Sequence, residues 1–323
     1  MRLVRFLPAA LMLAVAVLPL AVPWLKIILT VALAKGLAVL GVVVLLRAGQ
    51  VSFGHAMFFA GSAYSAAFLM QGLAGADLAL LLLAGMVCSG GMGAVIGLFV
   101  VRYRYIFFGM LNLAFSMVLY ALLEKLFHIT GGSDGMAVGR PTYFGLELAR
   151  TSFETALFYT SLVLAGAACW CVHRFLRSPL GEALSAIRTN ETRLEYLGIS
   201  ARRVLLIAYV LSAVLGGLGG TVIAVNQGVV TPDLGYWIRS GEFVFIAILG
   251  GAGNVLGAFA GALVYELVRF YAAALAADVW QMILGFVLLG IILFASRGLV
   301  GLYQDLVAVT ASARSGRDRE PKR

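Results

Sequence analysis

Long apolar runs separated by short polar segments make up most of the chain. The runs cover residues 6–25, 27–46, 54–73, 78–101, 106–123, 155–172, 204–225, 243–249, 255–274 and 279–295. A membrane-crossing helix needs about 20 consecutive apolar residues, and all the runs except 243–249 approach that length. Strands of a membrane β-barrel would instead alternate apolar and polar residues. The pattern therefore predicts an all-α integral membrane protein with short loops.

Basic residues gather on one side of the predicted membrane. If the N-terminus is cytoplasmic, the opposite side receives only Lys26, Lys125, Arg140, Arg150, Arg239 and Arg269. Cytoplasmic loops of membrane proteins carry an excess of Lys and Arg. The basic C-terminal tail stays cytoplasmic only if 243–249 also crosses. We therefore predict about ten transmembrane helices and cytoplasmic termini, with the eighth helix short and broken at 250–253; a re-entrant segment is the alternative.

Composition supports this class of protein. Of the 323 residues, 62% are hydrophobic and 12% are charged, whereas soluble domains carry about 25% charged residues. The net charge of +9 does not indicate nucleic-acid binding, because the basic residues lie at the ends of apolar runs. The three cysteines lie within apolar runs, so no disulfide framework or metal site is expected. We expect one transmembrane permease domain over 1–311 and a disordered, basic cytoplasmic tail over 312–323.

Two runs carry small residues at every fourth position. They are Gly85, Ser89, Gly93 and Gly97 in one run, and Gly253, Gly257 and Gly261 in the other. Small residues let helix backbones approach closely within a membrane. The stripes favour packing within this subunit, and contact with a second subunit is the alternative.

The longest predicted cytoplasmic segment, 174–203, has the capping signals of two short helices. Ser178 and Pro179 suit the start of the first helix, Asn190 suits the N-cap of the second, and Gly198 suits its end. Six arginines and three glutamates make the segment basic. It is suited either to lie against anionic lipid or to dock a cytoplasmic partner, and physical chemistry alone does not separate these alternatives.

Polar residues interrupt the chain between the second and third runs. Gln50, Ser52 and His55 lie at a glycine-flanked break, which leaves backbone groups free to meet a polar solute. An ordinary interfacial turn is the alternative. Lys35 is the most deeply placed charged residue, and it either snorkels, faces a partner subunit or lines a path. Glu266 and Arg269 are spaced to form an ion pair on one helix face.

Several motifs resemble those of one transporter family. They are GQVSFGH at 49–55, TGGSDG at 130–135, SPLGEALSAIRTNETRLEYLGI at 178–199, GGAG at 250–253, WQMILG at 280–285 and RGLVGL at 297–302. Their order along the chain resembles the branched-chain amino-acid ABC transporter permeases. The TGGSDG run is similar to the LivM-type subunit rather than to its LivH-type partner. Asn112 departs from the pattern usual for the family in the fifth run.

The resemblance implies transport by several chains together. A second, LivH-type permease would pair with this one, two cytoplasmic ATPase subunits would dock beneath, and a periplasmic binding protein would deliver the solute. Within the coupling loop 174–203, the implied ATPase contacts are Gly181, Glu182, Ala183, Ala186, Arg188, Glu191, Leu197 and Gly198. The candidates for the substrate path are Gln50, Ser52, Gly54, His55, Asn112 and Lys35. The implied location is the bacterial inner membrane, with membrane lipid around the subunit.

The sequence lacks the means to use ATP by itself. No Gly-x-x-x-x-Gly-Lys-Ser/Thr phosphate loop occurs, so we expect ATP and Mg on the partner subunits and no cofactor on this chain. No loop carries a convincing nucleophile or carboxylate pair, so no catalytic residue is expected.

The resemblance implies branched-chain, hydrophobic amino acids as substrates; urea, short amides and other amino acids are alternatives. A self-contained secondary transporter is a further alternative, although Glu124 and Glu266 lie near run ends rather than at the membrane midplane.

Overall fold

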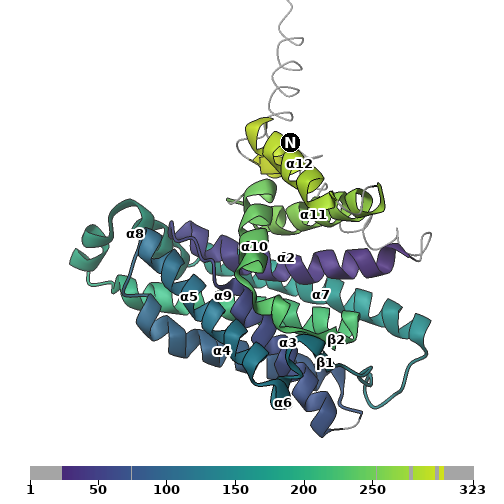
Figure 1. The fold of residues 1–323 in the computed structure, drawn as a ribbon. Helices are drawn as coiled ribbons and strands as arrows, with labels where there is room; N and C mark the ends of the chain where they lie inside the picture. Colours follow the sequence, from purple (N-terminus) through teal and green to yellow (C-terminus); the bar gives the residue numbers. More distant parts are fainter. Residues whose placement is uncertain (1–23, 74, 252, 276–278, 295–297, 302–323) are drawn as a thin grey trace, which may run out of the picture.

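The described part of the chain is almost entirely helical. The computed structural model describes residues 24–73, 75–251, 253–275, 279–294 and 298–301. Nearly all of the predicted crossing at 6–25, and the whole predicted tail at 312–323, lie outside these residues. The described helices are α2 (Leu25–Arg47), α3 (His55–Gly72), α4 (Leu78–Val100), α5 (Tyr105–Lys125), α6 (Phe127–Thr130), α7 (Arg150–Leu176), α8 (Pro179–Tyr196), α9 (Ala201–Gln227), α10 (Trp237–Gly250), α11 (Val255–Leu275) and α12 (Trp280–Phe294) (Figure 1).

Six of the described helices are long and apolar enough to cross a membrane, namely α2, α4, α5, α7, α9 and α11. The other candidates are shorter: α3 has 18 residues, α10 has 14 and α12 has 15. The fold is therefore that of a helical multi-span membrane protein. The predicted number of ten crossings is not confirmed, because only these six helices have the required length and hydropathy.

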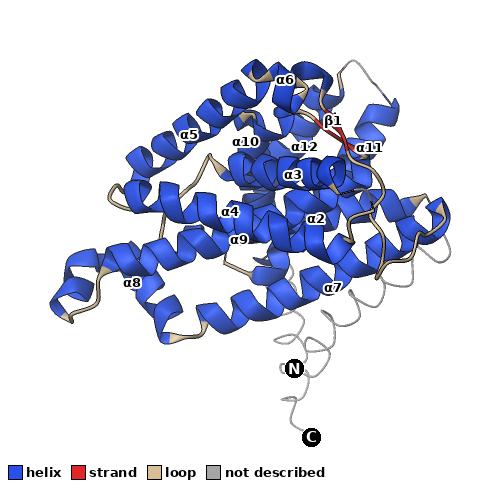
Figure 2. Cartoon of the chain, turned by 90° about the horizontal axis from the view of Figure 1, so that it is seen from below, coloured by secondary structure: helices blue, strands red, loops and turns tan. Residues whose placement is uncertain are grey.

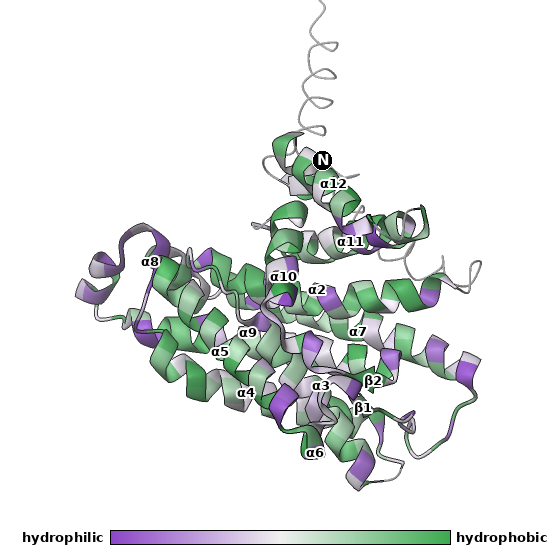
Figure 3. Ribbon diagram, viewed as in Figure 1, coloured by the Kyte–Doolittle hydropathy of each residue, from purple (hydrophilic) through white to green (hydrophobic). Residues whose placement is uncertain are grey.

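The long helices run back and forth between two ends of the bundle. At one end lies α8, where Arg188 packs against Gly49 beyond α2 and Glu191 pairs with Arg104 at the start of α5. At the other end β1 (Met136–Ala137) pairs antiparallel with β2 (Val229–Val230), just beyond the end of α9. Figures 1 and 2 show α8 and this ribbon at opposite ends of the molecule. The hydrophilic residues of α8 stand out in Figure 3.

Helices α2 and α9 form the centre of the bundle. Helix α2 packs on α7, α9 and α11, and α9 also packs on α3 and α4. Of the six long helices, α2 and α9 are the most buried. Glycine allows their close approach: a Cβ at Gly41 would lie 2.6 Å from the carbonyl oxygen of Ser212.

The α4 stripe packs inside the subunit, as do Gly257 and Gly261 of the second stripe, whereas Gly253 is exposed and precedes α11 (Val255–Leu275). In α4, a Cβ at Gly93 would lie 2.5 Å from the Cβ of Ala213, and one at Gly97 would lie 2.8 Å from the ring of Tyr209, both in α9. In α11, Gly257 and Gly261 contact the backbone of α10. Packing within the subunit, the interpretation favoured by the sequence, is the one that the structure supports.

Helix α10 begins inside the bundle rather than at its edge. The 3₁₀ helix η2 (Pro232–Gly235) precedes it, and the hydroxyl of Ser116, midway along α5, donates a 2.9 Å hydrogen bond to the carbonyl of Gly235. The helix ends at Gly250, and Gly251 has a φ of +102°. The predicted break at 250–253 is confirmed at its first residues, although the helix begins well before the predicted run 243–249.

Candidate functional site

The polar break after α2 is an extended segment whose side chains alternate between two environments. Gln50 and Ser52 are buried in the bundle, whereas Gly49, Val51 and Phe53 line a cavity. This is the two-residue alternation of an extended backbone. The residues singled out from the sequence therefore lie directly behind those that face the cavity.

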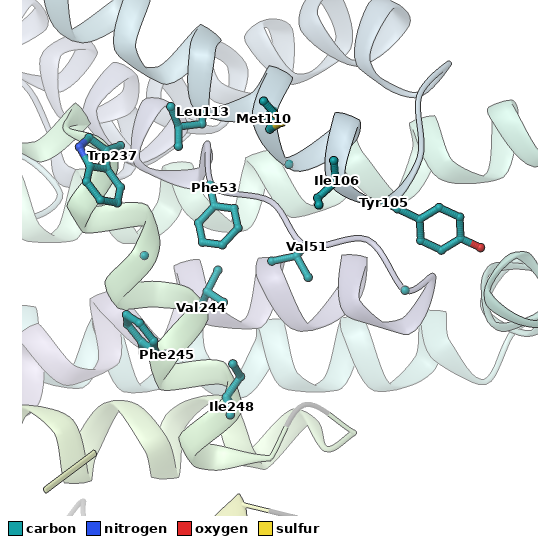
Figure 4. Close-up of a pocket in the computed structure, with 13 residues that line it drawn as sticks. Val51, Phe53, Tyr105, Ile106, Met110, Leu113, Trp237, Val244, Phe245 and Ile248 are labelled. Carbon is teal, nitrogen blue, oxygen red and sulfur yellow. The ribbon is translucent and has the colours of Figure 1, made fainter. Parts of the chain in front are cut away.

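The cavity has a volume of about 740 Å³ and an almost wholly apolar lining. Its walls come from the extended segment, the first half of α5 and one face of α10 (Figure 4). The lining side chains are Val51, Phe53, Tyr105, Ile106, Met110, Leu113, Trp237, Val244, Phe245 and Ile248, with glycines at 49, 109 and 241. This volume lies within the range typical of small-molecule pockets, about 300–1,000 Å³. The lining suits a small solute with an apolar side chain.

Gln50 fixes the extended segment to α5. Its Oε1 accepts a 2.8 Å hydrogen bond from the backbone N–H of Tyr105, and its Nε2 donates to the carbonyl of Ala48 at 3.4 Å. Tyr105 has a positive φ of 53°, a conformation uncommon for a residue other than glycine. Gln50 thus holds the first residue of a helix that lines the cavity. Ser52 acts more locally, because its Oγ accepts from the N–H of Gly54 at 3.4 Å.

His55 and Asn112 belong to two buried hydrogen-bonded groups, each of which joins α9 to neighbouring helices. His55 of α3 hydrogen-bonds through Nε2 with the hydroxyl of Ser212 in α9, which donates at 2.9 Å to the carbonyl of Gly41 in α2. Tyr209, also in α9, donates at 2.5 Å to Oδ1 of Asn112 in α5. Buried polar groups of this kind are stabilising when they are paired.

Five of the six path candidates therefore lie together, near the first residue of α3 and in the first half of α5. They are Gln50, Ser52, Gly54, His55 and Asn112. Gly54 contributes by its size, because a Cβ there would lie 2.5 Å from the carbonyl oxygen of Asn112. Sequence reasoning missed Tyr209 and Ser212, which complete the two hydrogen-bonded groups. Their positions inside a long apolar run gave no local signal. Solute contact with the five candidates stays a prediction.

Lys35, the sixth path candidate, lies elsewhere in a buried cluster of charges. Its ammonium forms ion pairs with Glu242 of α10 and Glu266 of α11. Glu242 also pairs with Arg239 at 2.8 Å, and Arg269 lies 3.7 Å from Glu266. The Lys35 side chain is only 3% exposed, so it does not snorkel to the membrane surface.

The cluster differs in two respects from the sequence analysis. Glu266 was expected near the end of its run, yet its carboxylate is buried beside Lys35 while it also faces Arg269 as predicted. Glu242 was missed. The available signal was the i, i+3 spacing of Arg239 and Glu242 just before the apolar run at 243–249.

Helix α8 carries all but the last two of the predicted coupling residues. Asn190 has non-helical angles (φ −161°, ψ 96°), and its Oδ1 accepts at 3.0 Å from the N–H of Arg193. The segment is thus two short helices with Asn190 as the cap of the second, as the sequence predicts. Ser178 caps the first, and Gly198 follows the second with a φ of +80°.

The predicted coupling residues divide into a buried set and an exposed set. Gly181 and Ala183 are buried against the bundle, and Ala186 is half-buried. Glu182, Arg188, Leu197 and Gly198 are exposed, and Leu197 is 73% exposed despite being apolar. Glu191 anchors the second helix through two hydrogen bonds of 2.8 and 2.7 Å from Arg104. One face of α8 therefore packs on the bundle while the other is free to meet a partner. A role in coupling stays a prediction.

A metal site needs several side chains that can bind the ion together. Among the described residues, no group of three or more His, Cys, Asp or Glu side chains is placed to hold a metal ion.

The fold and these sites define a multi-helix membrane protein with an apolar cavity and a surface helix pair at one end. The chain belongs to the family described as branched-chain amino acid transport system / permease component, whose model matches residues 25–292. This confirms the family predicted from the motifs.

Curated relatives point to the same subtype. The chain is similar to the high-affinity branched-chain amino acid transport system permease protein LivM of Escherichia coli (strain K12), at 30% identity over 242 residues, which cover 68% of this chain and 57% of that protein. LivM of Salmonella typhimurium (strain LT2) matches with the same identity and coverage. LivH of the same organism is 26% identical over 180 residues, which cover 53% of this chain and 57% of LivH. The higher identity and coverage of the LivM proteins support the predicted LivM type.

These matches span a little more than half the length of each of these relatives. No solved structure matches the chain.

Proposed function

We propose that this chain is the membrane-spanning permease subunit of an ATP-binding-cassette importer. It carries branched-chain, hydrophobic amino acids across the bacterial inner membrane, using ATP hydrolysed with Mg by partner subunits. The observation that carries the proposal is α8, a kinked helix pair with one face packed on the bundle and the other exposed. In this proposal the partner ATPases dock on the exposed face, and their movement on ATP hydrolysis is transmitted to the bundle through the packed face. The names of the LivM and LivH relatives support the substrate class.

In the proposed topology ten helices cross the membrane and both termini are cytoplasmic. Successive long helices run in opposite directions, which supports this topology. With both termini cytoplasmic, the end of α2, Arg104 and α8 all lie on the cytoplasmic side, where they contact one another. Cytoplasmic loops favour arginine, and α8 and its flanks are rich in it. Helix α10 is counted among the ten crossings although it is short. The irregular backbone that precedes it at membrane depth is tolerated because such backbone can be buried in protein or line a cavity.

The proposed path follows the apolar cavity between α5 and α10. The solute's side chain packs against residues such as Phe53, Met110 and Val244, while its polar groups meet the irregular backbone at 49–54. Gln50, His55 and Asn112 set the shape of this path by holding α3, α5 and α9 together, and Ser52 does so through its local hydrogen bond with Gly54. Their substitution then changes uptake while the subunits still assemble.

The proposed assembly contains a second, LivH-type permease, two ATPase subunits and a periplasmic binding protein. Support for the second permease comes from the cavity, which is bounded by α5 and α10 and is not fully enclosed by the described residues. Exposed apolar side chains such as Ile106, Met110 and Ile238 flank it. A second permease facing them would close the path.

The proposal is tested by co-purification and reconstitution. The tagged chain is extracted from its native membrane in mild detergent, and the co-purifying chains are identified by mass spectrometry. We expect two ATPases and a second permease, and uptake of labelled leucine into proteoliposomes only with ATP and the binding protein. Recovery of this chain alone, still active in liposomes without ATP, would identify a secondary transporter instead.

A further inference from the structure

The charged cluster around Lys35 holds more positive than negative charge. Where α2, α10 and α11 meet, it contains the cations Lys35, Arg239 and Arg269 and the carboxylates of Glu242 and Glu266. Two carboxylates are shared among three cations, so one positive charge has no carboxylate of its own within the cluster.

Burial shows where that excess charge lies. Lys35, Glu242 and Glu266 are at most 9% exposed, whereas the side chains of Arg239 and Arg269 are 25% and 37% exposed. Lys35 pairs with both inner carboxylates, and the two guanidinium groups form the outer layer. Guanidinium is suited to bind a carboxylate through two parallel hydrogen bonds.

Both arginines line a second cavity, of about 580 Å³, on the side of α10 next to α11 and α12. Two carboxylates, Asp233 of η2 and Glu242 of α10, also line it, and the other lining residues include Phe245, Trp280 and Leu284. The Arg269 guanidinium lies over the Trp280 ring at 5.6 Å from its centroid. Within the described residues, Asp233 forms no ion pair with either arginine. The cavity thus offers guanidinium groups, carboxylates and apolar side chains to a ligand.

We propose that this second cavity binds a free α-amino acid as a zwitterion. Arg239 and Arg269 take the carboxylate, Asp233 takes the ammonium group, and the apolar side chain packs between Trp280 and Leu284. This proposal rests on the proposed transport function and identifies where the charged end of the solute is recognised. Urea and simple amides carry no carboxylate, so they cannot form the contacts proposed for Arg239 and Arg269.

Phe245 connects this cavity with the apolar one, because it lines both. Its ring lies on the wall between a charged chamber and an apolar chamber, and it is half exposed, at 51%. The zwitterion site is therefore next to the proposed path rather than remote from it.

Direct binding to the purified permease complex, without the binding protein, tests the zwitterion site. Three ligands separate the two charges: leucine carries both, leucinamide keeps only the ammonium group, and 4-methylpentanoate keeps only the carboxylate. Titration calorimetry on R239Q and R269Q should show leucine and 4-methylpentanoate binding weakened about tenfold or more, with leucinamide unchanged. D233N should weaken leucine and leucinamide and leave 4-methylpentanoate unchanged. R150Q, which removes an exposed arginine outside the cavity, serves as the matched control.

Several results would overturn the proposal. Equal weakening of all three ligands in every cavity variant would show a merely structural role for these residues. A tightly bound phospholipid that leucine does not displace would assign the charges to a lipid headgroup. If wild-type complex takes up leucine with ATP while all three cavity variants bind every ligand normally, this site fails and the transport function stands. Loss of ATP-dependent uptake in the wild type would instead reject the transport function itself.

Discussion

Lys35 and Glu242 lie 207 residues apart in the chain and form an ion pair in the interior of the bundle. The pair joins α2, the central helix, to α10, the short helix that lines both cavities. Helix α10 packs on α11 and α2, and this ion pair adds a side-chain contact that helps to fix its position. The same lysine also pairs with Glu266 of α11. A single buried cation therefore sets the relative position of three helices beside the proposed path.

Replacing Lys35 with methionine should destabilise the subunit. The change keeps an unbranched side chain, one atom shorter, but leaves two buried carboxylates that share only the more exposed arginines. Breaking a buried ion pair by removing one partner costs about 3–5 kcal/mol. We expect a clearly lower melting temperature in detergent, measured by the fluorescence of a thiol-reactive or tryptophan probe.

The matched control for Lys35 is Lys125→Met, at the exposed end of α5. It should leave the melting temperature nearly unchanged. Equal melting temperatures for the wild type and Lys35→Met would show that the ion pairs contribute nothing to the stability of the bundle.

The features that the sequence predicted well are those with local causes. The kink at Asn190 and the end at Gly198 follow from capping chemistry within a few residues. The break after Gly250 follows from a run of glycines in the same way. The long apolar runs likewise predict helices at the right places, because bilayer thickness fixes their length.

The features that the sequence left open depend on contacts between distant segments. Nothing near Lys35 indicates that its partners are Glu242 and Glu266, so its side chain had three equally acceptable environments. The alternation at 49–54 is local, but which of its two faces meets a cavity depends on where α5 and α10 lie. Gln50 and Ser52 attracted attention as polar residues, whereas the lining residues Val51 and Phe53 resemble any other apolar side chain.

Replacing Gly54 with valine should separate α3 from α5. The backbone angle of Gly54 is one that other residues adopt (φ −117°), so the constraint is space rather than conformation. A Cβ would lie 2.5 Å from the carbonyl oxygen of Asn112, and further methyl groups would worsen the overlap. Overpacking of this kind costs about 1–3 kcal/mol. Thermal unfolding and size-exclusion chromatography measure the effect.

The control for Gly54 is Gly72→Val at the other end of the same helix, where an added Cβ meets no described atom within 4 Å. If Gly54→Val and Gly72→Val unfold at the same temperature, the close approach of α3 and α5 is not needed for stability.

Changes on the two faces of α8 should have different consequences. Glu182→Arg and Leu197→Asp alter exposed side chains, so we expect a folded subunit that no longer couples ATP hydrolysis to uptake. Gly181→Val alters the packed face, where a Cβ would lie 2.5 Å from the backbone of Leu176, so we expect loss of folded protein. Binding-protein-stimulated ATPase activity and leucine uptake, measured on the same proteoliposomes, separate the two outcomes. Normal uptake in both exposed-face variants would exclude α8 as the site of coupling.

Filling the apolar cavity should block transport without disturbing the fold. Gly241 lines the cavity, and an added Cβ there meets no described atom within 4 Å. A leucine in place of Gly241 therefore enters open space, and within a helix leucine is favoured over glycine by up to about 1 kcal/mol. We expect Gly241→Leu to keep or raise the melting temperature while leucine uptake falls at least about tenfold.

Gly91→Leu provides the comparison for Gly241→Leu, because Gly91 lies in α4, away from the cavity, and also has free space around it among the described residues. It makes the same change of side chain and should leave uptake intact. A graded series at Gly241, from alanine to valine to leucine, should reduce uptake in proportion to the volume added. Solutes with smaller side chains should lose less, because they need less of the cavity. If uptake is the same throughout the series, the solute does not pass between α5 and α10, and the path must lie on another face of the bundle.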